Sequence, residues 1–216
     1  MKEPYFTSAT IDHAAREMLR ELEELRGQRP WELEPEHAAL LVLDLQRYFL
    51  EKASHAYIPS AGAIVPRVKE LIAAFAARGR PVVFTRHLNT AEDAGQMAKW
   101  WGELIKRENP LSELIPELDT RAGMIIEKGQ YDAFHNTPLE ELLKERGVEQ
   151  LVISGVMAHL CCETTARSAF CRGFEVFFVV DGTATYNAGF HRATLLNLAH
   201  GFAHPVLVEE VLAAFK

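Results

Sequence analysis

Cysteines and long apolar runs are scarce in this sequence of 216 residues, and basic residues are outnumbered by acidic ones. The three cysteines include an adjacent pair and no Cys-x-x-Cys spacing, so we expect reduced thiols rather than disulfides or a zinc site. No apolar run is long enough to cross a bilayer, and the N-terminus lacks the apolar segment of a signal peptide. We therefore expect a cytoplasmic protein that does not bind membranes.

Basic residues number 23 against 30 acidic ones, which gives a net charge of -7. This sign of charge disfavours binding to nucleic acids and anionic membranes, so we expect a small-molecule substrate or a protein partner. Glycine-rich dinucleotide and phosphate-binding motifs are also missing after the first strand-like segment. Redox and kinase functions are therefore disfavoured, and we expect no cofactor.

Apolar runs typical of buried strands alternate with helix-like segments along the chain. The strand-like segments are residues 38–43, 81–85, 123–127, 150–154, 175–180 and 205–208. The main helix-like segments are residues 65–77, 96–106, 137–147, 161–172 and 189–201. This alternation predicts an α/β fold of three layers, with a six-stranded parallel sheet between two layers of helices, as in Rossmann-like proteins.

Residues 1–36 are predicted to form a helical extension that precedes the main domain at 37–216. Apolar side chains recur at helical spacing from Ile11 to Leu25, and Gly27 and Pro30 are expected to end this helix. One hypothesis is that the helix packs on a neighbouring subunit, in which case the protein would be a binding or assembly module rather than an enzyme.

Cys161 is the residue most suggestive of function. It lies where the strand-like segment 150–154 gives way to a helix, and the free N–H groups and dipole of a helix N-terminus favour a thiolate. A thiolate can attack a carbonyl carbon. Free cysteine is also among the most buried residue types, so packing alone is the competing interpretation.

Asp44, Arg86 and Lys128 follow other predicted strands, and ligands of parallel sheets bind beyond the carboxyl ends of the strands. Asp44 would accept the thiol proton and pass it to a leaving nitrogen if burial raises its pKa towards neutrality. Lys128 would hold the negative charge of the carboxylate or thiolate. Taken singly, Asp44 has a competing interpretation as a turn or capping residue, and Lys128 as a solvated loop residue.

Two further groups of side chains are candidates for ligand binding. Aromatic residues that would line a substrate pocket, or else cover edges of the core, are Phe49, Trp100, Trp101, Tyr131 and Phe134. His200 and His204 have a spacing that can hold a metal, but Gly201 intervenes, Pro205 follows and a third ligand is not evident. We therefore expect no metal site.

The chain resembles the isochorismatase-like cysteine hydrolase superfamily over about residues 36–208. The motifs that carry the resemblance are residues 41–46, 127–129, 131–134, 153–161, 164–166 and 179–184. The resemblance implies a triad of Asp44, Lys128 and Cys161. It further implies a cis peptide bond between Val156 and Met157, an oxyanion hole formed by the N–H groups of Met157 and Cys161, and a homo-oligomer, either a dimer or a tetramer.

The chain departs from the pattern of one branch of this superfamily. Nicotinamidases carry an Asp-x-His metal pair after the second strand, whereas this chain has Arg86-His87-Leu-Asn89. Arg86 and His87 are instead predicted to bind a substrate carboxylate, because arginine can grip one with two hydrogen bonds. His159 and the run Thr164–Ala166 resemble the isochorismatase branch, and we include His159 among the expected substrate-binding residues.

The leading hypothesis is a cofactor-free cysteine hydrolase that cleaves a C–N bond of a small amide, carbamoyl or ureido compound through a thioester acyl-enzyme. In the main alternative, the protein hydrolyses a vinyl ether as isochorismatases do, with Asp44 as the acid and Cys161 incidental. A non-catalytic binding protein on the same fold is the third possibility.

Overall fold

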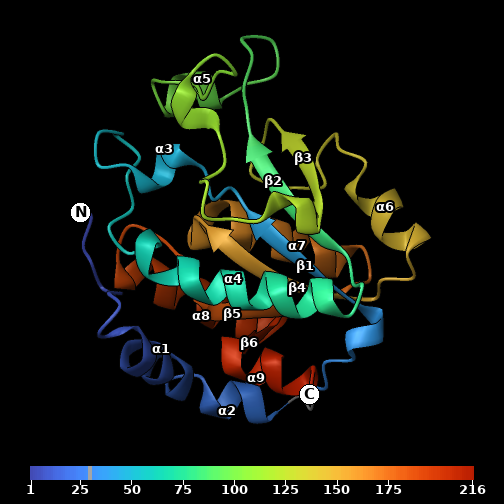
Figure 1. Cartoon of the computed structure of the whole chain (residues 1–216). Coiled ribbons are helices and arrows are strands. Elements are labelled where there is room, and N and C mark those ends of the chain that lie inside the picture. The colour runs from blue at the N-terminus through green and yellow to red at the C-terminus, as the bar shows by residue number, and fades with distance from the viewer. Residues whose placement is uncertain (29–30) are drawn as a thin grey trace.

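The computed structural model describes residues 1–28 and 31–216, and Figure 1 shows a central sheet enclosed by helices. The strands run in the order β3-β2-β1-β4-β5-β6, and every neighbouring pair is parallel. Their bounds are β1 Ala38–Leu43, β2 Val82–His87, β3 Met124–Lys128, β4 Gln150–Val156, β5 Glu175–Ala184 and β6 His204–Val206. The predicted six-stranded parallel sheet is confirmed.

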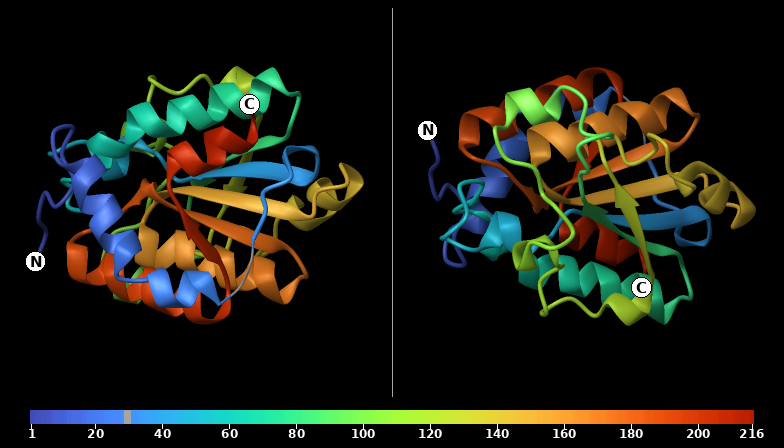
Figure 2. Two further views of the ribbon diagram at one scale, coloured as in Figure 1. Left: turned by 90° about the horizontal axis from the view of Figure 1, so that it is seen from below. Right: turned by 90° about the horizontal axis from the view of Figure 1, so that it is seen from above.

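Helices cover both faces of the sheet, as the three-layer prediction requires. Helices α4 (Ala61–Ala77) and α9 (Val208–Ala214) lie on one face, and α7 (Glu163–Cys171) and α8 (Ala188–Gly201) lie on the other (Figure 2). Shorter helices are α3 Arg47–Leu50, α5 Met97–Trp100, α6 Leu139–Glu145, η1 Pro35–His37, η2 Pro110–Ser112 and η3 Thr120–Ala122. In the described parts of the chain, no helix combines the length and apolarity needed to span a bilayer.

Sequence pattern explains the central strands well and the loops less well. All six residues of β1 and all seven of β4 are buried, because these strands are covered on both faces and are almost wholly apolar. Burial of each leucine of β1 contributes about 1.5–3 kcal/mol. The helix expected at 96–106 is only the four-residue α5, which stops before Gly102, a residue with a positive φ of 70°.

The N-terminal extension packs on its own chain. Helix α1 (Ile11–Arg20) buries Ile11 and Met18 in the core beside β5, and α2 (Glu23–Gly27) follows it. Ion pairs Arg16–Glu209 (2.6 Å) and Arg26–Glu210 (2.8 Å) join the extension to α9.

This packing leaves the apolar face of the N-terminal helix unavailable to a neighbouring subunit, and contact of the helix with another subunit stays a prediction. A helix with one apolar face buries that face against the nearest available core, and here the core belongs to the same chain. Pro30, expected to end the helix, lies outside the described residues.

The strand order changes direction between the neighbouring strands β1 and β4. Strands β2 and β3 extend the sheet on the side of β1, and β5 and β6 extend it on the side of β4. At this point Leu43 pairs with Gly155, and a Cβ on Gly155 would lie 2.0 Å from the carbonyl oxygen of Leu43. Gly155 also has φ +108°, a conformation that other residues rarely adopt. The close approach of the two strands brings the segments after them, Asp44 and the turn that holds Cys161, to one crevice.

Candidate active site

Asp44 follows β1 directly and has a left-handed backbone conformation, with φ 50°. Such a conformation is costly for a residue other than glycine and concentrates at functional positions. The hydroxyl of Thr85 accepts a hydrogen bond from the Asp44 backbone N–H (3.1 Å) and donates one to Oδ1 of the carboxylate (2.6 Å). The carboxylate is thereby held in one orientation inside the protein, with its side chain wholly buried.

Lys128 ends β3 and points its ammonium at the second oxygen of that carboxylate. Nζ lies 2.7 Å from Oδ2 of Asp44, and both side chains are 0% exposed. Nζ also donates to the carbonyl oxygens of Gln130 (3.0 Å) and Tyr131 (3.4 Å) and to Sγ of Cys161 (3.4 Å). A buried ion pair with this many additional partners fixes the position of the charge.

Cys161 lies in η4 (Ala158–Cys162), a π-helical turn between β4 and α7. π-helical turns are rare and occur frequently at functional sites. The turn places Sγ against Lys128, and the ligand atoms of Asp44 and Cys161 lie within 4.8 Å of each other. The three side chains of the implied triad are therefore in contact, although they come from three different strand ends.

The pKa directions in this cluster differ from those expected from the sequence. Burial raises the pKa of the Cys161 thiol to about 12, and the charge of Lys128 offsets this only in part. Burial alone would raise the pKa of Asp44, but Lys128 and the hydrogen bond from Thr85 bring it below its usual value. At neutral pH the cluster holds a thiol, a carboxylate and an ammonium.

Both sequence expectations on acidity were therefore wrong. The dipole of the following helix does not make Cys161 a resting thiolate, because desolvation of the buried thiol is the larger effect. The pKa of Asp44 is not raised towards neutrality, because the buried carboxylate lies 2.7 Å from the ammonium of Lys128. Burial by itself would lower the pKa of Lys128, but the Asp44 carboxylate and the hydrogen bonds to Asp44 and Cys161 raise it overall.

His87, at the end of β2, completes the buried group as a neutral hydrogen-bond acceptor. Its Nε2 donates to Oδ1 of Asn89 (2.9 Å), which leaves Nδ1 free to accept from Nζ of Lys128 (3.3 Å). Asn89 is oriented in turn by donating to the carbonyl oxygen of Gly129 (2.7 Å). Burial and the neighbouring Lys128 lower the pKa of His87 to about 4, so the imidazole carries no charge at pH 7.

Asp44, His87 and Cys161 have the donor types of a metal site, and their ligand atoms lie within 4.8 Å of one another. The ammonium of Lys128 already contacts all three. A divalent cation would have to displace that internal cation, so the donor set is better matched to a lysine than to a metal.

The candidate metal pair at the C-terminal end is separated by a change of secondary structure. Helix α8 ends at Gly201, so His200 is helical while His204 opens β6. Nε2 of His204 lies 3.2 Å from a carboxylate oxygen of Glu175. The two histidines therefore do not share the helical face that their spacing suggested.

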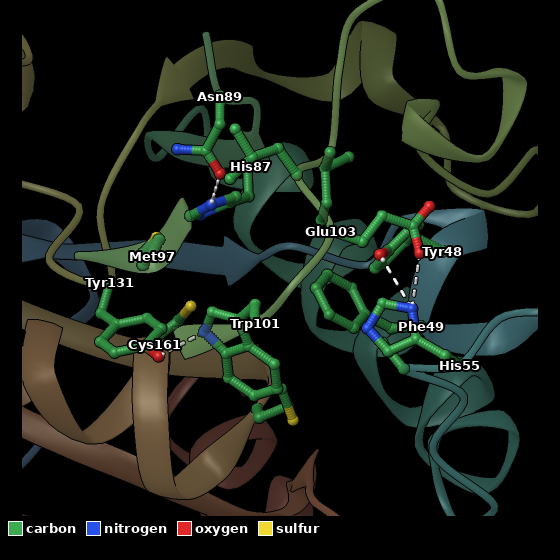
Figure 3. Close-up of a pocket in the computed structure, with 14 residues that line it drawn as sticks. Tyr48, Phe49, His55, His87, Asn89, Met97, Trp101, Glu103, Tyr131 and Cys161 are labelled. Atoms are coloured by element: carbon green, nitrogen blue, oxygen red, sulfur yellow. Dashed lines mark hydrogen bonds and ion pairs between the residues drawn. The ribbon is translucent and has the colours of Figure 1, made fainter. Parts of the chain in front are cut away.

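A pocket opens above Cys161 and is lined mainly by aromatic and apolar side chains (Figure 3). Its empty space, counted together with the open solvent at its mouth, is about 450 Å³. The aromatic residues of the lining are Tyr48, Phe49, Trp101 and Tyr131. Its polar residues outside this aromatic group include His55, His87, Asn89 and Glu103. The Trp101 indole N–H donates to the Tyr131 hydroxyl (2.7 Å) and links two of these walls.

The peptide bond between Val156 and Met157 is cis, as the resemblance implies. A protein-family model, the Isochorismatase domain, matches residues 38–210. This chain belongs to the isochorismatase family of hydrolases.

Three relatives illustrate the range of this isochorismatase family. Nicotinamidase 3 of Arabidopsis thaliana is 42% identical over 174 residues, which are 78% of this chain and 84% of that protein. Enterobactin synthase component B of Escherichia coli K12 is 34% identical over 194 residues, 85% of this chain, and the chain spans only 65% of that relative. The solved structure of a cysteine hydrolase from Pseudomonas syringae superposes with TM-score 0.82 at 27% identity, covering 86% of this chain and 95% of that one.

Arg86 does not reach the pocket of this isochorismatase-family protein, contrary to expectation. Successive residues of a strand point to opposite faces, so Arg86 and His87 within β2 diverge. The Arg86 guanidinium pairs with Glu113 (2.6 Å) and Glu127 (3.7 Å) and donates to the carbonyl oxygen of Ser112 (3.0 Å). The sequence prediction placed both residues at a strand end because it stopped β2 at Thr85.

The other expected substrate-binding residues divide into two groups. Phe49, His87 and Tyr131 line the pocket together with Met157 and Cys161. The oxyanion hole formed by the N–H groups of Met157 and Cys161 stays a prediction. Trp100, Phe134 and His159 do not line it.

Each of these three residues has another environment. Trp100 is 82% exposed, and its neighbour Trp101 occupies the pocket wall instead. Phe134 is buried and stacks on Phe174 at 5.9 Å. His159 stacks on Phe190 at 4.4 Å, away from the pocket.

Sequence reasoning missed most of the wall opposite Cys161. Tyr48, His55 and Glu103 come from α3 and from two loops, and they meet only in the folded chain. Asn89 was named in the sequence only as part of a departure from the metal motif, although it orients His87. Gln46 is the last residue of the motif 41–46, and the sequence indicates no role for it. Its amide accepts from the N–H of His87 (2.8 Å) and donates to its carbonyl oxygen (3.0 Å).

Proposed function

We propose that this isochorismatase-family protein is a cysteine hydrolase that cleaves a C–N bond in a small amide, carbamoyl or ureido compound. The observation that carries the proposal is the position of Cys161, whose thiol lies at the pocket floor in contact with the Asp44–Lys128 ion pair. A nucleophile, a proton acceptor and a fixed cation are the groups that acyl transfer from nitrogen requires.

In the proposed first step, Sγ of Cys161 attacks the carbonyl carbon of the amide while Asp44 takes the thiol proton. The resting thiol has a pKa of about 12, so its proton leaves as the sulfur attacks rather than beforehand. The carbonyl oxygen becomes an oxyanion, for which the N–H groups of Met157 and Cys161 are the proposed donors. Collapse of the intermediate breaks the C–N bond, and Asp44 returns the proton to the leaving nitrogen.

In the proposed second step, water hydrolyses the thioester. Asp44, again a carboxylate, takes a proton from the water, and the hydroxyl oxygen attacks the acyl carbon. The carboxylic acid departs and the proton passes to the sulfur, which restores the thiol. Lys128 keeps Asp44 in place through both steps, because its ammonium is fixed by the buried acceptors around it.

The pocket and a relative together support an amide as the substrate. Aromatic walls such as Phe49 and Trp101 fit a flat, small molecule. A relative of 42% identity is a nicotinamidase by name. His87 at the end of β2 and Asn89 beyond it hydrogen-bond to each other, and His87 also accepts from the triad lysine, which supports hydrolysis without a metal at that position.

The test is ammonia release from a panel of primary amides, carbamoyl compounds and ureides, measured in parallel on wild type and on Cys161→Ala. Turnover by wild type and none by Cys161→Ala is the expected result. Full activity of the alanine variant would contradict the proposal, provided that circular dichroism shows both proteins folded.

The rival vinyl ether hydrolysis needs Asp44 as a proton donor. Its pKa lies below the usual value, so Asp44 is a carboxylate at neutral pH and holds no proton to donate at the start of that reaction, whereas in amide hydrolysis it first receives one from the thiol. Isochorismate offered to wild type, Cys161→Ala and Asp44→Asn separates the two reactions. Turnover that survives in Cys161→Ala and is lost in Asp44→Asn would favour the rival.

A further inference from the structure

The pocket of the proposed hydrolase has no strong cation along its walls. Among the pocket-lining residues that the structure describes, neither arginine nor lysine occurs. His87 is held neutral, with a pKa lowered to about 4 by burial and by Lys128. Arg86, the expected partner of a substrate carboxylate, faces the other side of the sheet and is paired with Glu113.

The wall opposite Cys161 carries a carboxylate instead. In Figure 3 Glu103 lies across the pocket from Cys161, next to Tyr48 and His55. Oε2 of Glu103 lies 2.8 Å from Nδ1 of His55, and the Tyr48 hydroxyl lies 3.2 Å from the same nitrogen.

Hydrogen positions in this cluster follow from its donors and acceptors. When Nδ1–H of His55 donates to Glu103, that nitrogen has no lone pair for the Tyr48 hydroxyl. The hydroxyl then donates to the carboxylate, and burial together with the charge of Glu103 raises the pKa of Tyr48. The net charge of the three groups is -1 with His55 neutral and zero with His55 protonated. As long as Glu103 is ionised, this cluster therefore carries no net positive charge.

We infer that Glu103 determines substrate specificity by selecting amides whose far end carries an amine or another cationic hydrogen-bond donor, and by disfavouring those that end in a carboxylate. The inference rests on the proposed amide hydrolysis and replaces the expectation of an acid-bearing substrate. An ammonium can pair with Glu103 while Phe49 and Trp101 offer aromatic faces beside it. A carboxylate would meet Glu103 without a counter-ion.

The test uses three benzamides that differ at the position opposite the amide: aminomethyl, methyl and carboxylate. The value of kcat/KM for ammonia release is measured at pH 7 for wild type, Glu103→Gln and Glu145→Gln. Glu145 is an exposed residue of α6, so its change alters net charge equally without touching the pocket.

Wild type and Glu145→Gln are expected to prefer the aminomethyl over the carboxylate compound by about tenfold, and Glu103→Gln to reduce that ratio by about three- to tenfold. Preference for the carboxylate compound in wild type would overturn the inference. An unchanged ratio in Glu103→Gln would do the same.

Binding of the same three compounds to Cys161→Ala, measured by calorimetry, separates this inference from the proposed reaction. If ammonia is never released but the aminomethyl compound binds most tightly, and Glu103→Gln in the Cys161→Ala background removes the difference, the reaction fails while the selectivity holds. If Cys161-dependent hydrolysis occurs without a charge preference, only the inference fails. Absence of binding by all three compounds and of hydrolysis overturns both.

Discussion

The two ends of the pocket differ in how they are built. At the floor, Asp44 and Lys128 follow or end strands of the sheet, and their side chains are 0% exposed. At the opposite wall, His55 and Glu103 come from loops, and their side chains are 42% and 53% exposed. A carboxylate thus contacts a nitrogen donor once in the interior and once in partial contact with water.

Burial changes what each pair does. Breaking a buried pair leaves one uncompensated charge and costs about 3–5 kcal/mol, whereas an exposed pair contributes about 0–1 kcal/mol. Substitutions at the wall are therefore expected to lower the free energy of unfolding only slightly, while substitutions at the floor are expected to lower it strongly. In the proposed hydrolase the floor would carry the chemistry, and substrate selection could be altered at the wall with little loss of stability.

The largest effect is expected at the floor. Replacement of Cys161 by serine should lower kcat for the best amide by about 10⁴-fold or more, because a hydroxyl is a much weaker nucleophile in a site arranged for sulfur. The fold should be retained, since the two side chains are nearly equal in size. Steady-state kinetics and a thermal melt check the two halves of this prediction, and a modest decrease in kcat would contradict the nucleophilic role.

The next largest effect concerns the buried ion pair of Asp44 and Lys128 at the floor. Lys128→Met removes the cation from beside the Asp44 carboxylate and should lower the free energy of unfolding by about 3–5 kcal/mol. The double variant Lys128→Met with Asp44→Asn removes both charges and should recover most of that loss without recovering activity. Urea unfolding of the three proteins measures this, and equal loss in single and double variants would count against charge burial as the cause.

The floor was the part of the site that sequence could predict. Asp44, Lys128 and Cys161 each follow or end an apolar run, and the carboxyl ends of parallel strands meet at one edge, so their proximity follows from topology. The side chain directions did not follow. Strand β2 ends two residues later than predicted, and this was enough to send Arg86 to the opposite face from His87.

The wall and the acidities could not be predicted because they depend on distances between distant segments. His55 and Glu103 are 48 positions apart and lie in loops without periodicity, so no pattern connects them. The choice between Trp100 and Trp101 depends on where a four-residue helix begins. The pKa of Cys161 is set by burial against the charge of Lys128, and neither quantity is visible in sequence.

A smaller effect concerns acid stability at the floor. The unfolded chain protonates His87 below about pH 6.5, but the folded protein does so only below about pH 4, so stability falls as the pH drops through this window. The gap between 6.5 and about 4 corresponds to about 3 kcal/mol. His87→Gln keeps an acceptor for Lys128 and should make the decline shallower. Buried His191, with a pKa near 3, contributes equally in both proteins.

Urea unfolding of wild type and His87→Gln at several pH values between 7 and 4 measures that difference. If the two proteins lose stability in parallel, His87 is not the neutral buried group described above. Asp44 does not confuse the comparison, because its lowered pKa puts the loss of its contribution below about pH 4, and it is present in both proteins.

The smallest effect compares one hydroxyl from each end of the pocket. Thr85→Val removes the donor to Oδ1 of the buried Asp44 and should cost about 1–3 kcal/mol, because the carboxylate keeps no replacement for it. Tyr48→Phe removes a hydroxyl at the wall, where water can reach Glu103, and should cost under about 1 kcal/mol while changing KM more than kcat. Equal losses in the free energy of unfolding for the two variants would mean that the difference in exposure does not make the two ends of the pocket differ in stability. A larger cost for Tyr48→Phe would make the wall, rather than the floor, the rigid part of this pocket.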